Sequence, residues 1–300
     1  MARISVVIVT FESAHVLERC LSALPGASTR HDLDVWVVDN GSTDNSAAVA
    51  ARHVPNGHVV CLTENRGFAA GVNAGLARAT GEAIAVINPD AAPERGSLDV
   101  LMDLLDVSPR AGLVAPLVVT TGGTPETSVG HFPTAERERN HALWLDRLAG
   151  LQGRTCPFPP ETGSVDWASA CAWLLRADAV KAVGPLDERF FMYFDDVDYC
   201  RRIRAAGWDI LATRRARIRH DAGHGSTRTP SLPAEGGLSA AVYFNTHMPA
   251  GEAAAARRWL IRGWRLRAAA HQIAAWLGRP AGSQRAERYR QSLALARSAS

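Results

Sequence analysis

Three aspartates stand within four positions, at Asp195, Asp196 and Asp198, directly behind the aromatic segment "FFMYF". Apolar residues then recur at three- and four-residue steps, which predicts a helix from Asp195 to Gly207. One acidic residue at such a helix start is explained as a cap, because its charge suits the helix dipole. The other two need a further reason. A carboxylate against apolar surface has a raised pKa and can accept a proton near neutral pH, as a general base must.

Two further acidic side chains follow strand-like apolar runs. Asp39 ends "DVWVVD" and precedes "NGSTD", a turn whose Ser and Thr suit the cap of the next helix. A carboxylate at that strand end is also placed to hold a ligand amide or hydroxyl. Asp90 follows "AIAVIN" after Pro89, which alone could end the strand. Since Mg²⁺ typically binds one or two carboxylates together with phosphate oxygens, Asp90 is a candidate ligand of a divalent cation, Mg²⁺ or Mn²⁺.

Two glycine-containing segments add candidate phosphate ligands. The strand-like run "ARIR" reaches His220 and enters "DAGHGSTR", where Ser226 and Thr227 offer donors to a diphosphate. A single histidine is more often structural than catalytic, but His220 is a candidate metal ligand. Arg66 and Gly67 precede a helix pattern rich in small residues, at a place that favours anions. The sequence contains neither the dinucleotide fingerprint GxGxxG nor a Walker P-loop.

Alternating strands and helices must position these side chains. Nearly continuous apolar runs predict buried strands at 4–10, 34–39, 58–63, 83–88 and 112–119, with helices near 14–24, 44–52, 68–79 and 95–107 between them. This alternation predicts βαβ units and a mainly parallel sheet, whose ligands bind at the carboxyl ends of the strands. Residues 120–164 predict a long loop with a helix at 135–149, followed by a strand at 166–176 and a helical C-terminus.

Composition narrows the class of protein. The 300 residues are 47% hydrophobic and 21% charged, as in an ordinary globular protein. The longest apolar runs are too short to span a bilayer, and the first residues enter a strand pattern rather than a signal peptide. The five cysteines form no CxxC pair, which favours reduced thiols. We therefore expect a cytoplasmic protein.

The positive charge gathers at the C-terminus. Residues 251–300 hold ten arginines and two glutamates, a net charge of +8, so the first 250 residues carry −5 of the total of +3. Tryptophans are interleaved with these arginines in "ARRWLIRGWRLRAAAHQIAAWLG". Such a basic amphipathic helix, at 252–278, predicts peripheral contact with the anionic inner face of the plasma membrane. An equal alternative is packing on the catalytic domain or on the partner of a homodimer. Nucleic acid is not an expected ligand, because the rest of the chain is acidic.

In this order, the segments "SVVIVTFES", "VVDNGSTD", "ENRGFAAGVNAG", "INPD" and "DERFFMYFDDVDYCRRIRAAGW" resemble family 2 glycosyltransferases of the GT-A fold over about residues 3–228. Within the family the chain is most similar to rhamnosyltransferases that act on lipid-linked acceptors. The resemblance implies an α/β catalytic domain at 1–230, with a nucleotide-binding half at 1–119 and an acceptor half at 120–230, and a basic helical extension at 231–300. It also implies inverting transfer of L-rhamnose from dTDP-rhamnose to a lipid-linked saccharide, in cell-wall or polysaccharide assembly.

The resemblance assigns donor-binding roles to positions of this chain. It implies that the nucleoside lies by Thr10 and Glu12 and the pyrimidine base by Asp39, and that the donor is bordered by Arg66, Gly67, Asn88, Ser226 and Thr227. Asp90 would hold the metal on the diphosphate with support from His220. The sequence departs here from the family's DxD pattern, because "NPD" keeps only the final carboxylate.

The resemblance also assigns the chemistry at the opening aspartates. The family usually has Glu-Asp at this position with the Asp as base, so Asp196 is the expected base and Asp195 its hydrogen-bonding helper. Asp198 is expected to orient either the acceptor or the helix start, and Trp167 to contact the acceptor.

The sequence leaves one alternative function open and argues against three others. On the same fold, galactofuranose or N-acetylglucosamine could be transferred from a UDP donor. A sugar nucleotidyltransferase would need a glycine-rich N-terminal loop, which "VTFESAH" lacks, and a dehydrogenase would need GxGxxG. A non-catalytic scaffold would be expected to lack Asp90 or Asp196, and both are present.

Overall fold

The computed structural model describes the chain apart from residues 56–57, 149, 221–231, 279–282, 284–285, 288 and 294–300, and apart from the side chains of 232–235. Its contacts divide the chain into two compact units. The sheet unit comprises residues 1–130, 157–188 and 195–225, and the helical unit comprises 131–156, 189–194 and 226–300. The boundary at residue 230 stays a prediction, since the contacts group 131–156 and 189–194 with the C-terminal helices.

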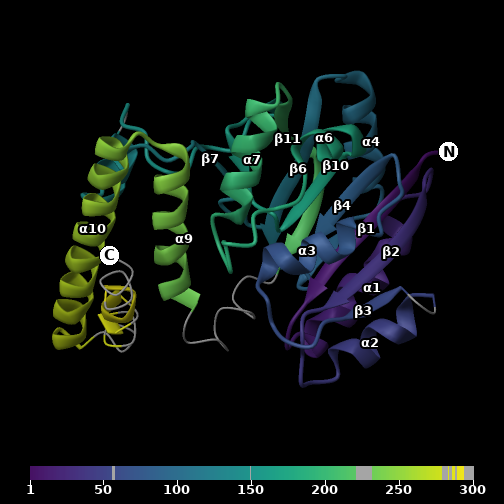
Figure 1. Cartoon of the computed structure of the whole chain (residues 1–300), viewed down its shortest axis with the longest axis horizontal. Coiled ribbons are helices and arrows are strands. Elements are labelled where there is room, and N and C mark those ends of the chain that lie inside the picture. Colours follow the sequence, from purple (N-terminus) through teal and green to yellow (C-terminus); the bar gives the residue numbers. More distant parts are fainter. Residues whose placement is uncertain are drawn as a thin grey trace. The chain divides into compact units, whose positions relative to one another are not determined.

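The sheet unit is built on a nine-stranded mixed sheet of order β3-β2-β1-β4-β10-β6-β11-β5, with β8 paired to β11. The strands are β1 (Arg3–Thr10), β2 (Asp32–Asp39), β3 (Val59–Cys61), β4 (Ala83–Ile87), β5 (Ala91–Pro93), β6 (Ala111–Thr120), β8 (Thr162–Ser164), β10 (Ala172–Arg176) and β11 (Asp209–His220). Strands β1 to β4 are parallel, and Figure 1 shows β2, β1 and β4 side by side. A separate two-stranded sheet pairs β7 (Val129–Gly130) with β9 (Trp167–Ala168).

Helices cover the sheet as βαβ crossovers require. They are α1 (Ala14–Ala27), α2 (Ser46–His53), α3 (Phe68–Leu76), α4 (Ser97–Val107), α6 (Ala177–Val183) and α7 (Asp195–Ala205). On one face of β1, Ile4, Val6 and Ile8 enter the main core with α1. On the other face, α3 comes close to the strand at its glycines: a Cβ added to Gly75 would stand 2.2 Å from a methyl group of Val7. The small residues of α3 therefore serve helix-on-sheet packing.

The structure corrects two element boundaries. The predicted strand at 166–176 is two strands, β9 and β10, separated by residues 169–171, and β10 runs antiparallel to β4 and β6. The predicted helix at 135–149 ends as α5 at Ala142 and is followed by a 3₁₀ turn, Leu145–Arg147. Edge strand β5, only three residues long, was not predicted. The five cysteines are free thiols, of which Cys20, Cys171 and Cys200 are buried.

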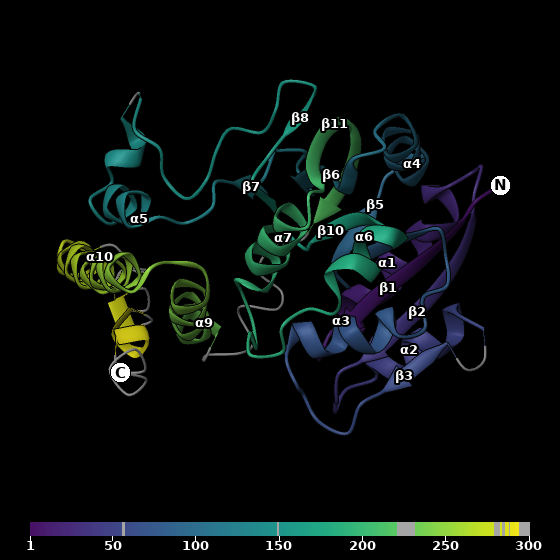
Figure 2. The ribbon, with the colours of Figure 1, turned by 45° about the horizontal axis from the view of Figure 1, so that its top comes forward.

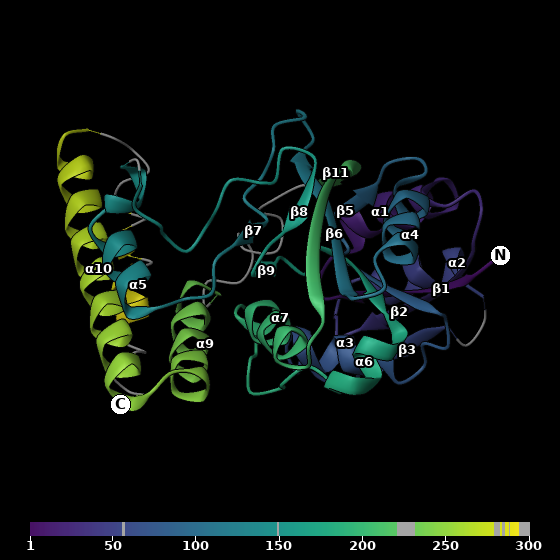
Figure 3. The same cartoon turned by 90° about the horizontal axis from the view of Figure 1, so that it is seen from above.

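The helical unit contains α5 (Ala135–Ala142), α9 (Leu232–His247) and α10 (Ala250–Trp276). A two-residue turn joins α9 to α10, and the two helices lie side by side (Figure 2). Figure 3 shows α5 along α10, where a Cβ on Gly263 would stand 3.1 Å from Cα of Ala142. Phe194 packs on Tyr243 and Phe244 of α9. Of the described helices, none combines the length and the apolarity that a membrane span requires.

Candidate active site

Three strand ends bring Asp90, Glu126 and His220 together. Asp90 follows β4, His220 ends β11, and Glu126 lies in the segment after β6. Nε2 of His220 is 3.3 Å from Oδ1 of Asp90, and its Nδ1 is 2.8 Å from Oε2 of Glu126. All three side chains are largely buried. Burial lowers the pKa of His220, but hydrogen bonds with Asp90 and Cys171 outweigh it and raise the pKa to about 11.

Asp90 and His220 would fit a divalent cation whose other ligands are phosphate oxygens, provided that the cation displaces the proton of His220 from Nε2, because only a neutral imidazole ligates a metal. Within the described part of the chain, no three His, Cys, Asp or Glu side chains are arranged as a complete metal site. Mg²⁺, however, is commonly held by one or two carboxylates, with substrate phosphates and water completing its octahedron. The shortened "NPD" motif supplies one candidate ligand, Asp90, and His220 at the end of β11 is the second.

Glu126 was not among the predicted site residues. Its Oε2 contacts His220, while Oε1 is buried without a hydrogen-bond partner among the described residues. Histidines that ligate metals usually have their second ring nitrogen bonded to a carboxylate or carbonyl, and Glu126 stands in that position. No local motif marks this glutamate, because it lies in an irregular segment and meets His220 only through the pairing of β6 with β11.

Thr10 and Asp39 lie opposite each other at the carboxyl ends of β1 and β2. Both side chains are buried, and Oγ1 of Thr10 and Oδ1 of Asp39 lack hydrogen-bond partners within the described residues. A buried polar atom without a partner is costly and in native proteins has a reason, such as a ligand. A nucleoside with donor groups would satisfy both atoms.

Glu12 has a structural task in the neighbouring turn. Its φ angle is +51°, a conformation that L residues adopt rarely, and Oε1 accepts hydrogen bonds from N of Thr43 at 2.7 Å and from its Oγ1 at 2.9 Å. In return, Ser42 accepts a hydrogen bond from N of Glu12. Its predicted contact with the nucleoside stays a prediction.

Asn40 holds the loop of Arg66 and Gly67. Its Nδ2 donates to the carbonyl of Gly67 at 2.9 Å, and its Oδ1 accepts from N of Arg66 at 3.1 Å. Gly67 begins α3 at a φ of +87°. The guanidinium of Arg66 pairs at 2.8 Å with the half-exposed Glu188, so a donor phosphate would compete with that carboxylate. Sequence reasoning assigned Asn40 to a turn and missed this positioning role.

Asp195 and Asp196 open α7. Asp195 is buried, and both burial and the neighbouring charge of Asp196 raise its pKa. Asp196 is partly exposed, and burial raises its pKa to about 6. Backbone N–H groups of Val197 and Ala170 donate to its carboxylate. The result is one carboxyl group that is mostly ionised at neutral pH beside one that favours its protonated form.

Residues 169–171, which interrupt the predicted strand, connect these two parts of the site. Ala170 donates to Asp196, while Cys171 lies in hydrogen-bonding contact with His220. The carbonyl of Cys171 accepts the N–H of Asn88 at 2.9 Å, which ties the end of β4 to the same turn. The turn between β9 and β10 thus contacts the candidate base through Ala170 and the candidate metal ligand through the adjacent Cys171.

The remaining predicted site residues are Asp198, Trp167, Ser226 and Thr227. Asp198 is 1% exposed and forms an ion pair with Arg202 at 2.9 Å. This arrangement suits the helix-orienting alternative better than contact with an acceptor. Trp167 lies in β9, partly buried. Ser226 and Thr227 lie outside the described residues.

Known proteins resemble this chain over most of its length. The family model described as Glycosyl transferase family 2 matches residues 5–165. An N-acetylglucosaminyl-diphospho-decaprenol L-rhamnosyltransferase of Mycobacterium tuberculosis is 31% identical over 273 residues, 86% of this chain and 89% of the relative. A pre-mycofactocin glycosyltransferase of the same organism is 31% identical over 73% of this chain and 42% of its own length.

Solved structures share the fold. The mannosyltransferase PcManGT from Pyrobaculum calidifontis, in complex with GDP-Man and Mn²⁺, has a TM-score of 0.58 at 16% identity and covers 99% of this chain and 86% of its own. TarS 1–349 of S. aureus in complex with UDP-GlcNAc has a TM-score of 0.54 at 14% identity, over 87% of this chain and 71% of its own. The predicted GT-A-like α/β fold with a C-terminal helical region is confirmed.

Proposed function

The chain belongs to glycosyl transferase family 2, and from that premise we propose that it transfers L-rhamnose from dTDP-rhamnose to a hydroxyl of a lipid-linked saccharide, with inversion. The observation that carries the proposal is the 31% identity with a named rhamnosyltransferase over most of both chains. The carboxylates of Asp195 and Asp196 at the start of α7 would supply the chemistry that such a transfer needs.

Asp196 is the proposed general base. With a pKa of about 6 it is mostly ionised at pH 7, yet basic enough to accept a proton from an acceptor hydroxyl in the transition state. The acceptor oxygen bonds to the anomeric carbon while the bond to the diphosphate breaks, and the leaving oxygen takes the electron pair. Asp196 receives the hydroxyl proton. Burial and the charge of Asp196 raise the pKa of Asp195, which favours its neutral form, and in that form it can donate a hydrogen bond.

The donor is proposed to lie over the ends of β1, β2 and β4. The unsatisfied atoms of Thr10 and Asp39 would hold the nucleoside, with Arg66, Gly67 and Asn88 at its border. Asp90 and His220 would hold Mg²⁺ or Mn²⁺, positioned by Glu126. Such a cation, when bound, stabilises the negative charge that develops on the leaving diphosphate. The mannosyltransferase of the same fold was solved with Mn²⁺ and its sugar nucleotide, which supports this proposal.

The acceptor side of the proposal includes peripheral membrane contact through α10. Along its outer face, Arg258, Arg262 and Arg265 are exposed. They are followed toward the C-terminus by exposed Ile273 and Trp276, the latter 86% exposed. Cationic side chains would meet anionic headgroups while the apolar end enters the interface. Co-sedimentation with anionic vesicles, compared with neutral vesicles, tests this part, and equal binding to both would contradict it.

A donor panel tests the donor assignment. The purified protein is incubated with dTDP-rhamnose, UDP-galactofuranose, UDP-N-acetylglucosamine and GDP-mannose, each with Mg²⁺, with Mn²⁺ and with a chelator, and release of nucleoside diphosphate is measured. The proposal predicts that metal-dependent release is fastest with dTDP-rhamnose. Preferential release of UDP would move the assignment to the alternative sugars on the same fold.

A further inference from the structure

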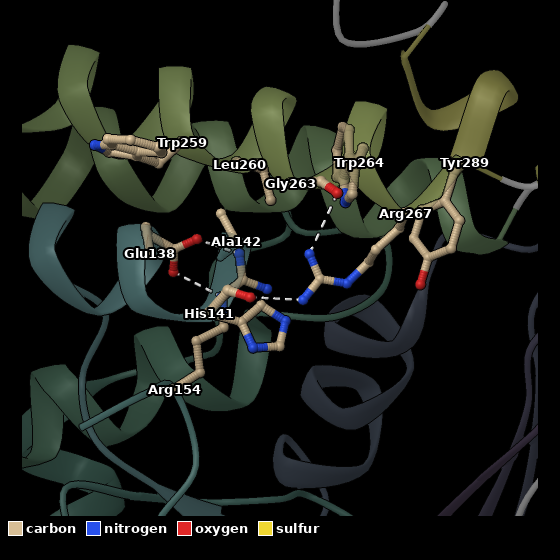
Figure 4. Close-up of a pocket in the computed structure, with 10 residues that line it drawn as sticks. All are labelled: Glu138, His141, Ala142, Arg154, Trp259, Leu260, Gly263, Trp264, Arg267 and Tyr289. Atoms are coloured by element: carbon tan, nitrogen blue, oxygen red, sulfur yellow. Dashed lines mark hydrogen bonds and ion pairs between the residues drawn. The ribbon is translucent and has the colours of Figure 1, made fainter. Parts of the chain in front are cut away.

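The helical unit contains a pocket of about 210 Å³ between α5 and α10 (Figure 4). Its lining combines charged and aromatic side chains from segments more than a hundred residues apart in the sequence. The lining residues are Glu138, His141, Ala142, Arg154, Trp259, Leu260, Gly263, Trp264, Arg267 and Tyr289. The catalytic proposal above uses none of them.

Around the pocket, the guanidinium groups of Arg147, Arg154 and Arg267 outnumber the carboxylates of Glu138 and Asp146, and Arg267 also stacks on the ring of Trp144. Arg154 forms a two-point ion pair with the buried carboxylate of Glu138, so these two charges balance. Arg267 instead donates to two backbone carbonyls, of Gly263 at 3.3 Å and of His141 at 2.7 Å. Carbonyl oxygens do not neutralise a guanidinium. An anionic ligand would supply the charge that these contacts lack.

The surroundings of the pocket lower the pKa of two of its cationic side chains. Burial and then the guanidinium of Arg154 lower the pKa of His141, whose Nδ1 lies 2.9 Å from Asp146. Burial likewise lowers the pKa of Arg267. Both groups are therefore less easily protonated than in water, as expected of cationic side chains that have lost solvent near another guanidinium.

Aromatic rings form the other wall. Trp259 and Trp264 project from α10, and Tyr289 comes from the C-terminal segment (Figure 4). The indole of Trp264 fits tightly over α9, since a Cβ on Gly237 would stand 2.1 Å from it. A fixed aromatic face suits the C–H face of a sugar ring, whereas a guanidinium suits phosphate oxygens. Drug-sized ligands occupy pockets of roughly 300–1,000 Å³, so this smaller pocket suits a sugar monophosphate rather than a whole sugar nucleotide.

We propose that this pocket binds a sugar phosphate, with the phosphoryl group at Arg267 and the sugar ring against Trp264 and Tyr289. The inference rests on the proposed function and deepens it, because a saccharide attached to a lipid diphosphate presents this chemistry. The helical unit would thus bind the phosphorylated head of the acceptor, and a free sugar phosphate is the other source of the same groups.

Titration of the whole protein with N-acetylglucosamine 1-phosphate tests the proposal, with indole N–H resonances of the tryptophans as the readout. N-acetylglucosamine and inorganic phosphate serve as separate arms, and we expect each to bind at least tenfold more weakly. Arg267→Gln is expected to raise Kd at least tenfold. Arg110→Gln removes the same charge from an exposed position of the sheet unit, outside every proposed site, and should leave Kd unchanged. If Arg267→Gln fails to fold, a saturable shift of the wild-type Trp264 resonance, identified with Trp264→Phe, still decides.

The experiments distinguish a failure of this inference from a failure of the proposed function. Absence of a saturable shift in the wild type, or equal Kd values for the two arginine variants, would overturn the proposal. Displacement of the sugar phosphate by a short-chain prenyl-diphosphoryl sugar is the expected result, and failure of displacement would overturn the assignment to the acceptor. No donor or turnover is involved. A transferase that does not bind sugar phosphate here refutes only this inference, and binding without any transfer refutes only the proposed function.

Discussion

Replacement of Asp196 by Asn tests the proposed base. Asn keeps the size of the side chain and an oxygen that accepts from the N–H of Val197, but it cannot take a proton. General base catalysis contributes about 10²- to 10⁴-fold. We therefore expect kcat of rhamnosyl transfer to fall by about that factor, with little change in donor affinity. Asp178→Asn is the matched control, since that aspartate is exposed on α6.

The pH dependence of the transfer rate follows from the raised pKa of Asp196. At a pKa of about 6, Asp196 is about nine-tenths ionised at pH 7 and about one-tenth at pH 5. Transfer by the wild type should therefore slow about tenfold from pH 7 to pH 5, and this acidic limb should be absent from the residual activity of Asp196→Asn. Initial rates at saturating substrates, measured from pH 5 to pH 8, provide the profile.

The raised pKa of Asp196 also makes the stability of the folded chain depend on pH, and the direction of this dependence is a further control. Between pH 4 and pH 6 the folded chain retains a proton on Asp196 that the unfolded chain, with its carboxyl at 3.8, has released. Stability therefore falls as pH rises through this window, and the variant should be no less stable than the wild type at pH 7. Wild-type-like transfer by Asp196→Asn, or a profile without a transition near pH 6, would refute the assignment of the base.

Three further predictions concern the supporting structure. Asp198→Asn should lower the free energy of unfolding by about 2–3 kcal/mol, because Arg202 loses its ion-pair partner. The loss stays below that of a fully buried ion pair because Arg202 is only partly buried. An unchanged urea midpoint would contradict this. Glu126→Gln should raise the half-saturating metal concentration of donor hydrolysis about tenfold by releasing His220, and an unaltered metal dependence would remove Glu126 from the site. Gly41→Ala should lower Tm, since φ there is +78° and a Cβ would stand 2.6 Å from facing backbone; an unaltered Tm would show that the turn relaxes without cost.

The sequence was most informative where residues close together in the chain determine the local structure. Continuous apolar runs ending in a polar residue predicted the strand ends that carry Thr10, Asp39 and Asp90, and parallel pairing then placed the first two side by side. The acidic start and glycine end of the helix at 195–207 predicted α7 to within two residues. In each case the signal and the structure lie within about ten residues of each other.

Long-range pairing was not predictable in the same way. The apolar run of β10 has no feature that specifies its antiparallel insertion between β4 and β6. The turn that links Ala170 with Asp196 follows from that insertion, and so does the contact of Cys171 with His220. The partnership of Glu126 with His220 likewise depends on the register of β6 and β11. These contacts are set by the packing of distant segments.

The most direct test of the proposed function is one transfer reaction with a lipid-linked N-acetylglucosamine acceptor. The acceptor is incubated with dTDP-rhamnose, UDP-galactofuranose, UDP-N-acetylglucosamine and GDP-mannose together, in the presence of Mg²⁺, and the mass of the lipid product is measured. The proposal predicts addition of one deoxyhexose, dependent on dTDP-rhamnose. Addition of a hexose or of an N-acetylhexosamine would contradict the assignment of rhamnose, and an unmodified acceptor would contradict transfer to a lipid-linked saccharide.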